Sequence, residues 1–126
     1  MWQLYHFPLC PFSRKVRLLL GEKGVACELK RVSPWQEDDE FADLNPANET
    51  PVLVDERNGT VLIDSAAICE YFEETVAAAP MIPGTSINRA EVRRLVGWFD
   101  GRLHREAVAP LMEERMRKRL VARAPP

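Results

Sequence analysis

The 126-residue sequence predicts an α/β domain followed by an all-helical segment, and three observations support this prediction. Short runs with strand character alternate with a helical pattern over residues 1–77. A stretch containing two prolines and a glycine within 78–85 is typical of a linker. Beyond it, apolar residues recur from Val92 to Leu103 at offsets 0, 3, 4, 7 and 11, which is helical spacing. We therefore expect a second, helical region over 86–126, with Ser86 as a possible cap and Pro110 bending or dividing the helix.

The first predicted elements are a strand, a helix and a second strand. Trp2–His6 has strand character, and Pro11 suits the first turn of a helix, where its missing N–H costs nothing. The helix should run over 11–23 and stop at Gly24, which tolerates a left-handed cap. Its apolar stripe is expected at Val16, Leu19 and Leu20. Val25–Arg31 alternates apolar and charged residues, and the helix between the two strands predicts that they lie parallel.

A β-hairpin and another helix complete the predicted domain. Val52–Val54 and Val61–Ile63 are apolar runs, and Asn58-Gly59 between them is a strong hairpin-turn signal. Asp64 or Ser65 could cap the next helix. Its buried face is expected to carry Ala67, Ile68, Tyr71 and Phe72. This order of elements predicts one mixed four-stranded sheet with flanking helices, which is a thioredoxin-like layout.

Composition and charge exclude several classes of protein. Apolar residues make up 46%, too many for a disordered chain, and no apolar run approaches the roughly 20 residues of a membrane helix. The start lacks the basic and apolar regions of a secretory signal, so we expect a soluble, cytoplasmic protein. Net charge is −2, with 7 basic and 14 acidic residues in 1–85 against 10 and 5 in 86–126. The basic part could bind nucleic acid, but its interleaved apolar residues favour a solvated helix face, so no nucleic-acid or membrane partner is expected.

Three cysteines, Cys10, Cys27 and Cys69, are widely spread along the chain. An odd number without a close pair argues against a disulfide framework. It also argues against a zinc site, which needs four ligands at short paired spacings. We therefore expect reduced thiols and no metal. Cys27 and Cys69 fit apolar core positions, a common use of cysteine.

The segment Cys10-Pro11-Phe12-Ser13 is the main candidate for chemistry. It places a thiol directly after a strand and at the start of a helix, where free N–H groups and partial positive charge stabilise a thiolate. The thiolate is the attacking form of cysteine. Ser13 stands where a redox pair would have its second cysteine, and its hydroxyl can donate to the Cys10 sulfur but cannot form a disulfide. A lone thiolate needs an external thiol to complete a redox cycle, which indicates a low-molecular-weight thiol.

Two further motifs fall at strand ends on the same side of the predicted sheet. Pro51 opens a strand, and in a thioredoxin-like layout this proline is commonly cis, which would expose the backbone of Thr50 to an extended, peptide-like ligand. At Asp64-Ser65, the helix N-terminus and hydroxyl suit a carboxylate and the Asp64 carboxylate suits an ammonium. Each motif alone also fits an ordinary role, as a turn cysteine, a strand-start proline or a helix cap. Their combination favours a binding site.

At these motifs the sequence resembles the cytosolic glutathione transferases. The matching segments are Cys10-Pro11-Phe12-Ser13, Thr50-Pro51-Val52-Leu53 and Asp64-Ser65-Ala66-Ala67-Ile68. The resemblance covers the whole chain, with 1–77 as the thioredoxin-like glutathione-binding domain and 86–126 as the first helices of the all-helical domain. Further helices are expected to complete that second domain. Because the family is usually dimeric, the resemblance implies a homodimer.

The resemblance assigns the thiol end of a glutathione site. Cys10 resembles the cysteine of omega-like and bacterial members, which forms a mixed disulfide with glutathione. Ser13 would assist Cys10, and Phe12 would line the pocket beside the thiol. Family members that use tyrosine or serine instead activate glutathione, and here Tyr5 and Ser13 are the fallback candidates for that role.

The resemblance also assigns the peptide part of glutathione. The backbone of Thr50, before Pro51, would pair with the cysteinyl part, and Asp64 and Ser65 would hold the γ-glutamyl end. The family often has a basic residue just before the position of Thr50, near the glycyl carboxylate. Glu49 stands there in this sequence, which departs from the family pattern at that contact.

Three functional classes remain open. In the first, an enzyme of glutathione-dependent detoxification, Cys10 attacks a glutathionylated small molecule and is released by a second glutathione, or bound glutathione attacks an electrophile. A cysteine at the helix start favours the first of these chemistries. The second class is a non-catalytic regulatory or protein-binding module, for which the basic stretch Arg115–Arg119 would be the feature to watch. The third, the chloride intracellular channel proteins, shares Cys-Pro-Phe-Ser but ranks last because no segment here is suited to a membrane.

Overall fold

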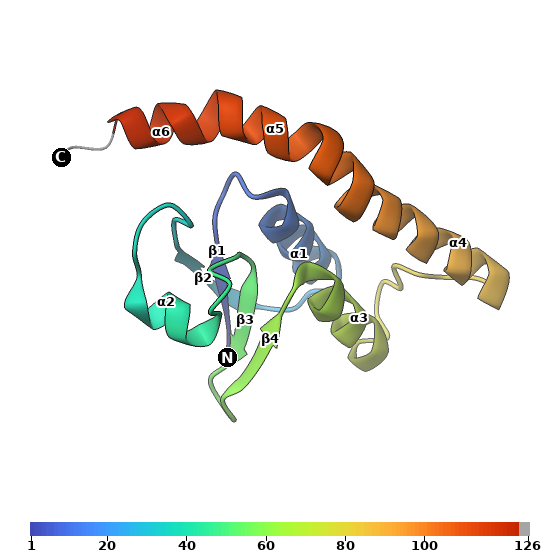
Figure 1. Ribbon diagram of the computed structural model, residues 1–126. Coiled ribbons are helices and arrows are strands. Elements are labelled where there is room, and N and C mark those ends of the chain that lie inside the picture. Colours follow the sequence, from blue (N-terminus) through green and yellow to red (C-terminus); the bar gives the residue numbers. More distant parts are fainter. Residues whose placement is uncertain (124–126) are drawn as a thin grey trace. The chain divides into compact units, whose positions relative to one another are not determined.

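The computed structural model describes residues 1–123, and its four strands form one sheet in the order β2-β1-β3-β4 (Figure 1). The strands are β1 (Trp2–His6), β2 (Cys27–Arg31), β3 (Val52–Asp55) and β4 (Thr60–Ile63). β1 and β2 are parallel, whereas β1 and β3, and β3 and β4, are antiparallel. The predicted mixed four-stranded sheet is therefore confirmed.

Three helices accompany the sheet: α1 (Pro11–Glu22), α2 (Asp39–Leu44) and α3 (Ser65–Thr75). Figure 1 shows α1 and α3 next to one another and α2 on the other side of the sheet. The α1 crossover joins the parallel strands β1 and β2, as the sequence pattern predicted. This arrangement confirms the thioredoxin-like layout.

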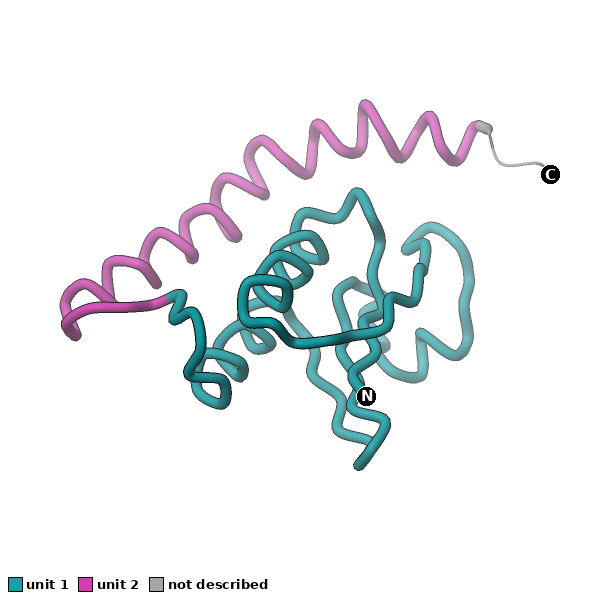
Figure 2. The backbone as a smooth tube through the Cα atoms, turned by 180° about the vertical axis from the view of Figure 1, so that it is seen from behind, with its two compact units in different colours: residues 1–81 teal, residues 82–126 magenta. Residues whose placement is uncertain are grey.

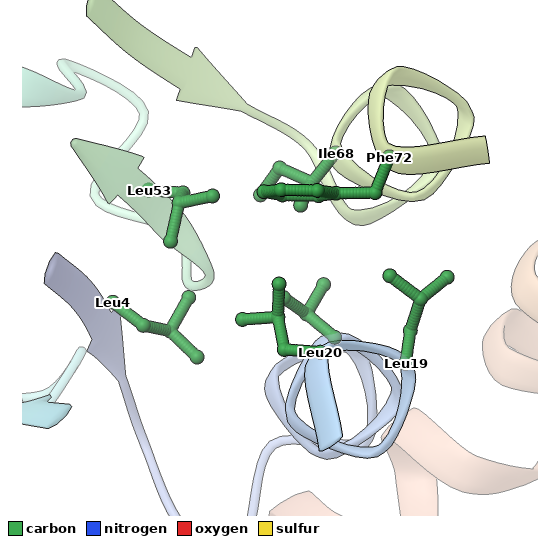
Figure 3. Packing of buried hydrophobic residues seen from close by; sticks show 7 residues of the cluster. Leu4, Leu19, Leu20, Leu53, Ile68 and Phe72 are labelled. Atoms are coloured by element: carbon green, nitrogen blue, oxygen red, sulfur yellow. The ribbon is translucent and has the colours of Figure 1, made fainter. Parts of the chain in front are cut away.

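Each face of the sheet has its own apolar core. Figure 3 shows the larger one, in which side chains of β1, β3, α1 and α3 meet. Its buried residues are Leu4, Val16, Leu19, Leu20, Leu53, Ile68 and Phe72. The smaller core, on the α2 side, consists of Tyr5, Val32, Phe41 and Val52. Because successive strand residues point to opposite faces, neighbours in β1 and in β3 serve different cores, and these two central strands are buried on both sides.

The end of α1 explains why β2 is shorter than predicted. Gly24 has φ +67°, the left-handed conformation expected of the residue that ends the helix. The Val25 N–H then donates to the Leu20 carbonyl at 2.9 Å. Val25 is therefore engaged by the helix end, and the strand begins two residues later, at Cys27.

The start of α3 follows the predicted cap. Asp64 is the N-cap, with its side chain accepting from the Ala66 N–H. Ile68 and Phe72 on the predicted inner face are buried. The prediction for the rest of that face is partly wrong, since Tyr71 is half-buried and Ala67 is exposed.

The chain separates into two compact units, Met1–Met81 and a second unit from Ile82 onward, coloured differently in Figure 2. From Ser86 to Arg123 the second unit is one continuous run of helical turns. In order they are α4 (Ser86–Gly97), η1 (Trp98–Val108), α5 (Ala109–Met112), η2 (Glu113–Arg117) and α6 (Lys118–Arg123), where η1 and η2 are π-helical.

Two local predictions for this second unit are corrected. The N-cap of α4 is Thr85, whose hydroxyl accepts from the Asn88 N–H at 3.3 Å, and Ser86 is the first helical residue. Pro110 does not divide the helix. It lies in the short α5, with wider π-type turns before and after it, so the helical path continues through the position that lacks an N–H.

Candidate functional site

Three strand ends lie together at one edge of the sheet. In the register, Tyr5 pairs with Val52 and Val52 pairs with Ile63. The end of β1, the start of β3 and the end of β4 therefore lie side by side. The loops that continue from these ends carry Cys10, Thr50-Pro51 and Asp64-Ser65, which is the convergence expected from the sequence.

Cys10 is held at the start of α1 with its side chain half-buried. It is the N-cap of the helix, and its sulfur accepts from the Ser13 N–H at 3.5 Å. The same sulfur lies 3.5 Å from the Thr50 carbonyl oxygen, to which the thiol donates. The Thr50–Pro51 peptide bond is cis. One helix terminus and one strand start thus meet at the thiol, as a thiol-centred site requires.

Ser13 contributes to this arrangement through its backbone. Its side chain is completely buried, and its hydroxyl oxygen accepts from the Phe7 N–H at 3.3 Å. The contact to the Cys10 sulfur comes from the Ser13 backbone N–H, where the sequence suggested the hydroxyl. A hydroxyl with no exposed surface is better placed to fix the loop between β1 and α1 than to contact a ligand.

Phe12 is half-buried in the first turn of α1, two residues after the thiol. Phe7, on the other side of the thiol, is buried and packs edge-to-face on Trp35, with 4.9 Å between ring centroids. Aromatic side chains therefore stand on both sides of Cys10 along the chain.

The loop before Thr50 is fixed by two asparagines that the sequence analysis did not single out. The Asn45 amide donates to the Glu49 carbonyl at 2.8 Å, and its oxygen accepts from the Ala47 N–H at 3.1 Å. The Asn48 amide donates to the Pro34 carbonyl at 3.3 Å. These contacts hold the backbone that places the Thr50 carbonyl at the thiol. The turn-forming dipeptide Asn45-Pro46 was the signal that could have identified this loop.

Thr50 itself leaves one backbone group available. Its carbonyl faces Cys10, whereas its N–H makes no hydrogen bond to any residue between 1 and 123. Its side chain is nearly buried. Glu49, one residue earlier, is exposed, so the departure from the usual basic residue lies on the surface beside this backbone.

Asp64 and Ser65 form the third part of the site. Asp64 has φ +79°, a conformation that non-glycine residues rarely adopt and that tends to occur at functional positions. Its exposed carboxylate caps α3 by accepting from the Ala66 N–H at 3.1 Å. Ser65 is buried at the first helical position. The remaining N–H groups of the first turn lack partners by helix geometry, which suits a carboxylate ligand.

Tyr5 is poorly placed to replace Cys10. It lies on the α2 side of the sheet, stacked on Phe41, and its hydroxyl donates to Glu40 at 3.1 Å. Burial, followed by the hydrogen bond to Glu40, raises the pKa of Tyr5 above its ordinary value. A phenolate is therefore disfavoured there, so the position of Tyr5 argues against its use as the fallback for Cys10.

No group of three or more histidine, cysteine or acidic side chains suited to a metal occurs within residues 1–123. All three cysteines are free thiols. Over the same residues, no helix is both long and apolar enough to cross a membrane.

The sequence family model for the N-terminal domain of glutathione S-transferases matches residues 4–80, more than half of the chain. The chain belongs to the glutathione transferase family. A similar curated protein is FtsZ-localized protein A of Caulobacter vibrioides, 41% identical over 98% of this chain and 55% of that protein. The sequence resemblance stated from three short motifs is thereby confirmed at the level of the family.

Solved transferase structures have the same fold. A glutathione S-transferase from Rhodospirillum rubrum aligns with a TM-score of 0.91 and 42% identity, over 96% of this chain and 55% of that one. A glutathione S-transferase from Methylobacillus flagellatus with glutathione bound aligns with a TM-score of 0.79 and 32% identity, over 92% and 56%. This chain spans about half the length of these three relatives.

Proposed function

We propose that this transferase-family chain binds glutathione and uses Cys10 as the nucleophile of a thiol-transfer reaction. The observation that supports this proposal best is the position of the Cys10 sulfur, 3.5 Å from both the Ser13 N–H nitrogen and the Thr50 carbonyl oxygen. A half-exposed thiol beside a helix N-terminus is a suitable site for an attacking sulfur.

Glutathione would lie along the edge where the three loops meet. The Thr50 N–H is available to pair with the cysteinyl part of the tripeptide, in the manner of an added β-strand. The first turn of α3 and Ser65 would take the α-carboxylate of the γ-glutamyl residue, and Asp64 its ammonium. The related Methylobacillus flagellatus transferase with bound glutathione supports this ligand class.

The reaction would proceed in two exchanges. The Cys10 thiolate attacks the glutathione sulfur of a glutathionylated thiol, forming a Cys10–glutathione disulfide and releasing the other thiol as a thiolate. A second glutathione thiolate then attacks the glutathione sulfur of this mixed disulfide, which releases glutathione disulfide and regenerates the Cys10 thiolate. Within the site, the Ser13 N–H stabilises the sulfur while the buried Ser13 hydroxyl fixes the loop. Phe12 would border the acceptor.

The test compares wild type with Cys10→Ser and, as a matched control, Cys27→Ser. Each protein is incubated with glutathione disulfide and examined by intact mass spectrometry, and turnover of a small glutathionylated thiol is measured. We expect a glutathione adduct and turnover in wild type and Cys27→Ser, and neither in Cys10→Ser. Turnover that survives in Cys10→Ser would contradict the proposal and favour activation of bound glutathione.

A second candidate function is a non-catalytic, partner-binding module. It is favoured by the 41% identity to FtsZ-localized protein A, whose name describes localisation with FtsZ rather than catalysis. For this chain it predicts that Cys10 can be replaced without loss of partner binding. Absence of any glutathione adduct or turnover in wild type, together with an unchanged fold, would favour this candidate.

Self-association belongs to the same proposal, because family members are usually dimers. We expect the chain to sediment as a homodimer in analytical ultracentrifugation. A monomer over the whole concentration range would remove this part of the proposal without affecting the role of Cys10.

A further inference from the structure

An open pocket of about 540 Å³ lies between α1 and β2, on unit 1. In the sheet, β1 lies between β2 and β3. The Thr50 loop, which leads into β3, is therefore on the other side of β1 from β2. None of the residues proposed to hold glutathione lines this pocket. It is therefore a site separate from the thiol.

The floor of the pocket is aliphatic. Leu18 of α1 and Leu29 of β2 line it although 62% and 48% of their surfaces are exposed. Val25 and Cys27, both half-buried, complete this part of the wall. Concave apolar surface of this kind, with a volume within the roughly 300–1,000 Å³ of small-molecule sites, is suited to an apolar ligand body.

Two arginines form the polar part of the same wall. Arg14 and Arg17 are three residues apart on α1, so they project from the same side of the helix. Arg31 at the end of β2 lies on the same sheet face as Leu29, two residues before it. Within residues 1–123, none of these three guanidinium groups makes a hydrogen bond or an ion pair.

Several arginines of the second unit are paired with glutamates, whereas Arg14, Arg17 and Arg31 are not, within the described residues. On the second unit, three exposed arginines each pair with a glutamate three or four residues away. These pairs are Arg94 with Glu91, Arg102 with Glu106 and Arg117 with Glu113. The pocket thus concentrates positive charge that the described part of the chain does not neutralise.

His6 adds to this picture from inside the sheet. It is 6% exposed, and its Nδ1 is the buried side-chain polar atom left without a hydrogen bond within the described residues. Burial, then the charges of Arg17 and Arg31, lowers the pKa of His6. Arg17 and Arg31 therefore both lie near His6, and both add positive charge on this side of the sheet.

We infer that this pocket binds a small aliphatic carboxylic acid as its anion. The carboxylate would lie between Arg14 and Arg17, whose planar guanidinium groups can donate in pairs to carboxylate oxygens. The aliphatic chain would cover Leu18, Val25 and Leu29. This ligand would pair with the two guanidinium groups and also cover the exposed apolar floor. A simple inorganic anion would pair with the arginines but leave the apolar floor exposed.

In the first experiment, octanoate is titrated into the 126-residue chain carrying Cys10→Ser, and the heat of binding is measured by isothermal titration calorimetry. We expect one saturable site. Arg17→Gln should weaken octanoate binding about tenfold, since it removes a charge-assisted hydrogen bond. Arg94→Gln, which changes an exposed arginine of the second unit, is the matched control and should leave binding unchanged.

Cys27 supplies an independent reading of the same site. Because its thiol lines the pocket, octanoate should slow its alkylation several-fold, whereas Cys69, outside the pocket, should react at an unchanged rate. The Cys10→Ser background keeps the thiol of the proposed glutathione site out of the measurement.

A second variant addresses a possible folding defect in Arg17→Gln. Leu18→Glu alters an exposed residue of the helix and places a negative charge in the pocket, so octanoate binding should be lost while thermal unfolding stays unchanged. The inference is overturned if octanoate does not bind or if 1-octanol binds equally well. It is also overturned if octanoate binding and Cys27 protection in Arg17→Gln and Leu18→Glu are the same as in the parent chain. Failure of glutathione binding would leave these results unaffected, so the two proposals are tested separately.

Discussion

The two units of the chain differ in how they bury apolar surface. Unit 1 (Met1–Met81) has two closed cores, and residues such as Leu4, Val16 and Ile68 have no exposed surface. In the helices of unit 2, from α4 to η2, no residue is buried, and Trp98 and Phe99 are 44% and 52% exposed. Unit 1 therefore has the packing of an independent folding unit. The apolar stripe of unit 2, by contrast, is exposed and could pack against other protein surface.

The same contrast applies to charges. Unit 1 holds a fully buried ion pair between Lys23 and Glu73, whose side chains are 0% and 6% exposed. The ion pairs of unit 2 join exposed side chains one helical turn apart. Because water screens exposed pairs, breaking the buried Lys23–Glu73 pair should cost far more stability than breaking an exposed pair of unit 2.

The largest effect is expected from a matched pair of phenylalanine truncations. Phe72→Ala in the larger core should lower the free energy of unfolding by about 3–5 kcal/mol, since it removes buried area and leaves a cavity. Phe99→Ala in unit 2 should cost less than about 1 kcal/mol. Urea unfolding measures both. Equal costs would show that Phe99 is buried by protein surface in solution and would break the comparison.

The buried ion pair should give the next largest effect. The Lys23 ammonium bonds to Glu73 at 3.1 Å and to the carbonyls of Val76, Ala78 and Ala79, so it ties the end of α1 to the segment after α3. Lys23→Met should destabilise by about 3 kcal/mol, because it leaves Glu73 buried without its cation. Thermal or urea unfolding measures this cost.

Two controls sharpen that experiment. The double variant Lys23→Met/Glu73→Gln should recover part of the lost stability by removing the unpaired charge. Lys118→Met, which breaks an exposed pair with Glu114, should change unfolding far less than Lys23→Met. A similar loss in both single variants would contradict the distinction between buried and exposed pairs.

The smallest effect concerns acid. Hydrogen bonds from the Arg57 side chain to Asp55, which is 3% exposed, lower the pKa of that carboxyl to about 2. Because the folded state favours the ionised form, this contribution is present above the ordinary pKa of aspartate and is lost as pH falls from about 4 towards 2. Asp55→Asn should therefore flatten the loss of stability in that window.

The matched residue in unit 2 is Glu91, whose pKa is lowered by its hydrogen bond to Arg94. The side chains of Glu91 and Arg94 are both exposed. Glu91→Gln should therefore reduce the acid-induced loss of stability less than Asp55→Asn does. Unfolding measured at a series of pH values below 5 tests the pair. The comparison fails if the two variants have the same acid profile.

Local signals accounted for most elements of unit 1. Gly24 ended a helix, Asn58-Gly59 turned a hairpin, and Asp64 capped α3, since each depends on backbone conformations or caps set within a few residues. The start of α4 was missed by one residue, because serine and threonine are both favoured at N-caps and only the hydrogen bond from Asn88 identifies Thr85 as the cap.

The candidate site was predictable in outline but not in detail. Cys10, Thr50 and Asp64 stood out because strand ends and helix starts are visible in the sequence. The buried hydroxyl of Ser13 and the loop contacts of Asn45 were not visible, since they depend on which backbone groups a fold brings within hydrogen-bond distance.

The sequence by itself thus determined most of the order of strands and helices, most of their turns and caps, and the family. Only the tertiary structure decided that the Cys10 sulfur touches Thr50, 40 residues away, and that Lys23 is a buried cation. It also decided that Arg14 and Arg17 line a pocket without a partner among residues 1–123. The physical reason is range. Periodicity and capping act over a few residues, whereas contacts between distant segments, and the burial of charge, arise only when the sheet and helices pack together.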